Sequence, residues 1–288
     1  MDKFIRRLGT SLGLALLAFG LFGAPAAQAG IADTKHNLGT SGKATNNNKY
    51  DGTGEICVFC HTPHGSDTNA SVPLWNRALG TPGSYTTYNS LGTSSLDGAT
   101  APVGSVSLAC LSCHDGTQAM NVMLNTPGSG TAALTGSWGT SSNIGLATDG
   151  KEGAIKGGIT MIGKDLKNDH PVGIQYAGGP KTAGAFGGTG TDKYTSSLFR
   201  DADFKPASSA TINNQQVWWV DTSVGTSGAR EKTDMQLYTR TDTGTGDLAG
   251  TQPFVECASC HDPHSSTNAT FLRVSNDGSG VCLSCHIK

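Results

Sequence analysis

The pattern Cys-x-x-Cys-His occurs four times in the sequence, and the four boxes use all eight cysteines. Two cysteines separated by two residues can form thioether bonds to the two vinyl groups of one haem, and the histidine that follows can bind its iron. The pattern therefore predicts four covalently attached c-type haems. The cysteines are Cys57, Cys60, Cys110, Cys113, Cys257, Cys260, Cys282 and Cys285, and the proximal iron ligands are His61, His114, His261 and His286.

Two other chemistries use paired cysteines. Eight cysteines in an exported chain can form a disulfide framework, and Cys-x-x-Cys pairs also bind zinc. Neither chemistry requires a histidine directly after every pair, whereas haem attachment does. Haem is therefore the favoured interpretation, and no cysteine is left over for a structural disulfide.

The N-terminus has the pattern of a secretory signal, with three basic residues, an apolar run and a small-residue cleavage site that ends at Ala29. Residues 1–29 are predicted to be a signal peptide and 30–288 the mature chain, which has no further segment able to span a membrane. The signal carries three of the 20 basic residues and one of the 22 acidic ones, so the mature chain is acidic. Without a basic patch, nucleic-acid binding is not expected.

Glycine is abundant, at 40 residues, and only 15% of the chain is charged. Such a composition favours a mostly irregular, loop-rich chain wrapped around large apolar cofactors that supply much of the core. With four boxes, we expect that core to be organised by four stacked haems. Short helices are expected at the boxes and across Gln118–Leu124, with a few short strands, of which Gln216–Val220 and Met235–Tyr238 are the best candidates. The pair Trp218-Trp219 is expected to pack in a small apolar cluster.

Material outside the boxes also repeats. Each half contains His-x-[Leu/Val]-Gly, a box extended by x-Pro-His, Thr-Asn-Ala, an apolar patch with an arginine, and finally Cys-Leu-Ser-Cys-His. The sequence therefore predicts two dihaem modules within one tetrahaem domain, at about 30–125 and about 165–288. A long insertion rich in Gly, Ser and Thr, about 175–250, interrupts the second module.

Four histidines remain outside the boxes and four haems each need a sixth ligand, so we expect bis-histidine ligation by His36, His64, His170 and His264. His64 lies three residues from His61, a reach of about 10 Å, which is too short to pass around the same porphyrin. From the repeat, His64 is assigned to the Cys110/Cys113 haem and His264 to the Cys282/Cys285 haem. His36 and His170 are then left for the other two. Met120 and Met123 are competing sixth ligands, for which apolar packing is the preferred interpretation.

The order of these motifs and their flanks resembles the extracellular tetrahaem cytochromes of the OmcE type, a cytochrome nanowire family. The resemblance rests on the signal peptide and on Lys-His-Asn-Leu, Pro73-Leu74-Trp75-Asn76-Arg77, Cys-Leu-Ser-Cys-His and Asp-His-Pro-Val-Gly, and leaves the Gly-rich insertions unmatched. It implies a homopolymeric filament at the cell surface in which a histidine of one subunit ligates a haem of the next. It also implies other cytochromes as electron donors and extracellular electron acceptors.

Three functions are compatible with the sequence. The first is electron transfer without enzymatic activity in such a filament, with His36, which lies in a polar N-terminal arm, ligating either its own chain or a neighbouring subunit. The second is a monomeric periplasmic tetrahaem shuttle whose ligands all come from one chain. The third is a multihaem enzyme, which needs an open axial position on a haem, whereas this chain has enough histidines to fill all of them.

Overall fold

The computed structural model describes residues 30–43, 46–69, 71–128, 134–181, 199–222, 224–240 and 252–287. The predicted signal peptide lies outside the described residues, as do two stretches of the predicted insertion, 182–198 and 241–251. From Ile31 onward the chain forms one compact unit. No helix among the described residues is long and apolar enough to cross a membrane.

Helices form at the boxes, where the cysteine spacing needs a helical turn. The first box contains the 3-10 helix η2 (Cys57–Phe59), and the others lie in α2 (Ser105–His114), α3 (Cys257–Cys260) and α4 (Gly280–Cys285). A capping box starts α3, in which Glu256 and Ser259 satisfy each other's backbone N–H groups. The remaining short 3-10 helices are η1 (Gly30–Asp33), η3 (Pro82–Ser84), η4 (Tyr88–Leu91), η5 (Tyr176–Gly178), η7 (Ala269–Phe271) and η8 (Asp277–Ser279).

The expected helix across Gln118–Leu124 is wrong, because this segment forms turns. Its backbone carbonyls are used by a buried arginine rather than by a helical ladder. Met120 is buried in an apolar cluster with Tyr50 and Phe59, and Met123 packs against the same cluster. The apolar packing preferred for both methionines is therefore observed.

Five strands form an antiparallel sheet in the order β3-β7-β6-β5-β4. The expected strands are observed as β5 (Gln215–Val220) and within β6 (Met235–Arg240), but the sheet is larger than the sequence indicated. A separate hairpin consists of β1 (Ile144–Leu146) and β2 (Glu152–Ile155). The other strands of the sheet are β3 (Ile174–Gln175), β4 (Ser208–Ile212) and β7 (Gln252–Val255).

The sheet supports the second pair of boxes. Trp218 is fully buried in a cluster with Met235 and Leu237, which are side chains of the adjacent strand β6. Cys260 and Cys285 pack against this cluster from the box side, and α3 contacts β6. Trp218 therefore packs in an apolar cluster, as expected for the pair, whereas Trp219 is buried but is not part of that cluster. The cluster supports α3 and α4, which carry the third and fourth boxes.

Candidate haem-binding sites

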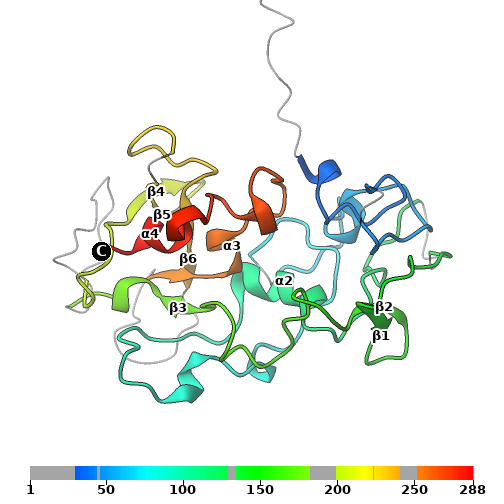
Figure 1. The fold of residues 1–288 in the computed structure, drawn as a ribbon, viewed down its shortest axis with the longest axis horizontal. Helices are drawn as coiled ribbons and strands as arrows, with labels where there is room; N and C mark the ends of the chain where they lie inside the picture. Colours follow the sequence, from blue (N-terminus) through cyan, green and yellow to red (C-terminus); the bar gives the residue numbers. More distant parts are fainter. Residues whose placement is uncertain are drawn as a thin grey trace, which may run out of the picture. The chain divides into compact units, whose positions relative to one another are not determined.

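The four boxes lie next to one another in sequence order. Burial raises the pKa of the Cys60 thiol to about 12, and the nearby Cys113 thiol contributes to the increase. The Cys110 thiol is hydrogen-bonded to that of Cys257, and Cys282 is close enough to Cys260 to influence its pKa. In Figure 1, α2, α3 and α4 follow one another across the view, and α2 contacts α3. This order places each attachment site beside the next.

Backbone carbonyls orient three of the four proximal imidazoles through their Nδ1 atoms. The pairs are His61 with Pro73 at 2.8 Å, His114 with Thr160 at 2.8 Å and His261 with Thr270 at 2.7 Å. An Nδ1–H that donates to a carbonyl leaves Nε2 unprotonated and available to a metal. The sequence gives no signal for these carbonyls, because they come from loops 9 to 46 residues away.

The first and third boxes hold their carbonyl partners with the same local fold. Leu74 and Phe271 both have positive φ angles, 57° and 64°, directly after the residue whose carbonyl accepts from the histidine. Each of the two also accepts a backbone hydrogen bond from the residue after the box histidine, at 2.9 Å and 2.8 Å respectively. The left-handed turn therefore sets the carbonyl against the imidazole in both places.

The next residues of the two loops also correspond. The backbone N–H of Asn76 donates to the carbonyl of Cys60, and that of Arg273 donates to the carbonyl of Cys260, both at 2.9 Å. The side chains of Asn76 and Arg273 then donate to the carbonyls of Val58 and Ala258, each of which directly follows the first cysteine of its box. Arg273 is thus the counterpart of Asn76, and Val274, not an arginine, stands where the first module has Arg77.

Six of the eight histidines form three close pairs. The ring centroids are 6.1 Å apart for His36 and His114, 6.2 Å for His61 and His264, and 6.4 Å for His170 and His261. A metal–imidazole bond of about 2 Å, with the ring centre roughly 1 Å behind the nitrogen, separates two axial rings on one iron by about 6 Å. The three pairs therefore fit bis-histidine haem.

Two of these pairs differ from those expected from the repeat. His264 lies beside His61 and not beside His286, and His36 lies beside His114, the position expected for His64. His170 lies beside His261, one of the two positions left open for it. The repeat could not indicate the pair of His61 with His264, because this pair joins histidines of different modules.

His36 is held inside its own chain. Its ring stacks on Phe271 with centroids 4.3 Å apart and is hydrogen-bonded to the backbone of Pro263. Burial and the neighbouring imidazole of His114 lower the pKa of His36 to about 4, which keeps the ring neutral, as an iron ligand must be. The polar N-terminal segment therefore packs against its own chain at His36.

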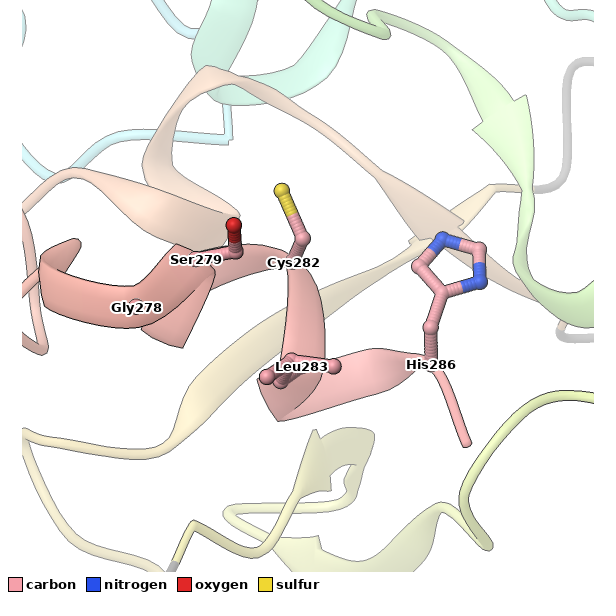
Figure 2. Close-up of a pocket in the computed structure, with 5 residues that line it drawn as sticks. All are labelled: Gly278, Ser279, Cys282, Leu283 and His286. Atoms are coloured by element: carbon pink, nitrogen blue, oxygen red, sulfur yellow. The ribbon is translucent and has the colours of Figure 1, made fainter. Parts of the chain in front are cut away.

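His64 and His286 are the two histidines without a ring contact to another histidine in the described chain. Both are exposed. His286 contacts Phe204, with centroids 4.2 Å apart. Cys282 on α4 and His286, which directly follows α4, line a hollow (Figure 2). Its volume of about 600 Å³ suits a cofactor. The fourth site is thus open to the surface.

Two buried donors near the first two boxes also fit a haem. The indole Nε1 of Trp75 and the Nε of Arg77 have no hydrogen-bond partner among the described residues. Trp75 packs against Cys60 and Ala109, the residues beside the first and second haem positions. The carboxylates of haem propionates are acceptors that such orphaned donors would suit.

Comparison with known proteins identifies part of this arrangement. Residues 252–288, which contain the third and fourth boxes, match a family described as the doubled CXXCH motif. A search of curated proteins finds no match to the chain. The matched motif indicates covalently bound c-type haem, and it supports a multihaem c-type cytochrome that carries electrons.

Proposed function

We propose that the protein is a subunit of an extracellular filament that conducts electrons through four bis-histidine haems. Bound haem supplies the one-electron chemistry, while the protein makes and breaks no substrate bond. The histidines hold the irons, the carbonyls of the box loops fix the imidazole orientation, and the packed boxes set the spacing between neighbouring haems. Other cytochromes would donate electrons at one end, and external acceptors would take them at the other.

One observation carries the polymeric part of the proposal. Three histidine pairs form within the chain, which leaves two exposed histidines. His64 lies beside the first box, and His286 is the proximal histidine of the fourth. In Figure 1 the blue segment of the first box and α4 lie on opposite sides of the view. His64 of one subunit is therefore proposed to ligate the haem of His286 in the next, in place of the trans ligation by His36 considered from the sequence.

The surface near the fourth box suits such a contact. Leu283, which is 38% exposed, lines the hollow, and Ile287, which is 49% exposed, directly follows His286. Burial of these side chains by a second subunit would add apolar contact to the coordination bond. Head-to-tail contacts of this kind generate open filaments when the rotation does not close a ring.

Electron microscopy of purified holoprotein tests the proposal. We expect fibres from the unaltered protein, no fibres from His64→Ala, and fibres from the matched variant His36→Ala. All three proteins should retain four covalent haems by mass, because the thioether bonds do not depend on sixth ligands. Fibres from His64→Ala would refute ligation between subunits, and a monodisperse single-chain species from the unaltered protein would favour the periplasmic shuttle.

A further inference from the structure

We propose that the haem of the fourth box is an accessible site for small axial ligands wherever no neighbouring subunit covers it. In a filament this condition holds at one end only, and in a single chain it always holds. The ligands are small uncharged molecules that bind haem iron, such as carbon monoxide on the reduced haem and free imidazole on the oxidised one. The filament-end part of this inference rests on the proposed function, whereas the single-chain part does not.

The first step is the contrast between His286 and the other proximal histidines. His61, His114 and His261 each face a second imidazole at 6.1 to 6.4 Å between centroids. All eight histidines lie in the described part of the chain, and there the one ring contact recorded for His286 is with Phe204. The other three sites are therefore closed by the chain itself, and the fourth is not closed by a histidine.

The second step is that His286 is held in place without a second imidazole. Its backbone N–H donates to the carbonyl of Cys282 at 3.0 Å, and it forms an antiparallel bridge with Phe204. The N–H of Ile287 adds a bond of 2.7 Å to the carbonyl of Asp203. The backbone of His286 is thus held by the 203–205 segment. His286 can therefore keep its place as the proximal ligand even when nothing occupies the opposite face of the haem.

The third step is access. The hollow of about 600 Å³ is lined by Gly278 and Ser279, by Cys282 and His286, and by the exposed side chain of Leu283. A small molecule can reach such a surface site without opening the fold, whereas α2 and α3, which carry the second and third boxes, pack against each other. Met235 is the main internal rival as sixth ligand, because it lies in the cluster against which Cys285 packs.

The test uses the His64→Ala holoprotein as a single-chain form. Titration of the reduced protein with carbon monoxide should reach one molecule per four haems, and titration of the oxidised protein with free imidazole should reach the same stoichiometry. Fibres of the unaltered protein should bind almost no carbon monoxide, because the neighbouring subunit covers the fourth haem. If the unaltered protein forms no fibres, its single chains should still bind one carbon monoxide, so that loss of the filament leaves this inference standing.

Two further variants locate the site. Leu283→Trp should narrow the mouth of the hollow and weaken imidazole binding several-fold in the His64→Ala background, whereas Leu146→Trp, at a residue 62% exposed on β1, should not. Addition of His170→Ala should raise the stoichiometry to two. The inference is overturned if the single chain binds no carbon monoxide and is fully low-spin, or if Met235→Leu is needed before binding occurs.

Discussion

The imidazoles of His61 and His264 are nearly parallel, at 18° between their planes, with centroids 6.2 Å apart, although they belong to different modules. His61 is anchored by the carbonyl of Pro73, and His264 lies 3.4 Å from the carboxylate of Asp262. Each ring is therefore held from behind, which leaves the space between them for an iron. An iron bound by both rings would tie the first box to the third.

Replacement of the distal ring should open that haem. We expect His264→Ala to keep four covalent haems while one of them becomes high-spin, because the backbone around His61 still holds the proximal imidazole. Electron paramagnetic resonance on single chains measures this change. The measurement uses the His64→Ala background, in which the protein is a single chain and the haem of the fourth box is already open. There His264→Ala should raise the number of high-spin haems from one to two. No additional high-spin haem on His264→Ala would contradict the observed pairing.

The sequence predicted the attachment boxes because a box is a local pattern, and six of the eight histidines that it named lie in pairs at a spacing that suits two ligands of one iron. It also predicted β5 and part of β6, which are rich in aromatic and other apolar residues. It could not predict which distal histidine faces which box, because tertiary contacts decide the pairing. His264 faces His61 of the other module, and His36 faces His114 while its ring stacks on Phe271 of the other module. The turns across Gln118–Leu124 were missed for a related reason, because the partner of their carbonyls is Arg77, more than 40 residues earlier.

Arg77 is a fully buried cation beside the first two boxes. Its guanidinium donates to the carbonyls of Ser112, Ala119, Met120 and Val122 at 2.8 to 3.1 Å. Arg77→Gln should lower the unfolding free energy by about 3 kcal/mol, since several buried carbonyls lose their donors. It should also lower the reduction potentials of the first two haems, because a nearby positive charge stabilises an added electron.

Urea unfolding and spectroelectrochemistry measure these two effects. Arg273→Gln is the matched control, because Arg273 also bonds backbone carbonyls but is only partly buried. We expect it to have the smaller effect on stability, with no change in the potentials of the first two haems. Equal shifts from both variants would show that the buried position of Arg77 has no special effect on the haems.

Glu256 joins the second and third boxes through a buried network. Its carboxylate accepts from Arg240 at 2.7 Å and from the hydroxyl of Ser107 on α2, at side-chain exposures of 3% for Arg240 and 0% for Glu256. Ser107 in turn accepts from the backbone N–H of Cys257. Glu256→Ala should cost about 3 to 5 kcal/mol of unfolding free energy, because it leaves a buried guanidinium without its carboxylate.

Chemical denaturation of the holoprotein measures this loss. The exposed pair of Lys151 and Asp149 offers a control, since their side chains are 61% and 50% exposed. Asp149→Ala should change the unfolding free energy by less than about 1 kcal/mol, because water screens such pairs. A loss in Glu256→Ala no larger than in the control would refute a structural role for the network.

Tyr176 should make the fold sensitive to alkali. Its side chain is 1% exposed, its hydroxyl donates to the carbonyl of Lys205 at 2.8 Å, and burial raises its pKa above the ordinary value of 10.0. Because the folded pKa is the higher one, this contribution is complete below about pH 10 and is lost progressively as the pH rises further. Tyr176→Phe should cost about 1 kcal/mol at neutral pH, and the difference from the unaltered protein should shrink above about pH 10. Unfolding free energies between about pH 7 and about pH 11 measure this convergence, and a difference that stays constant with pH would show that the phenol does not ionise on unfolding.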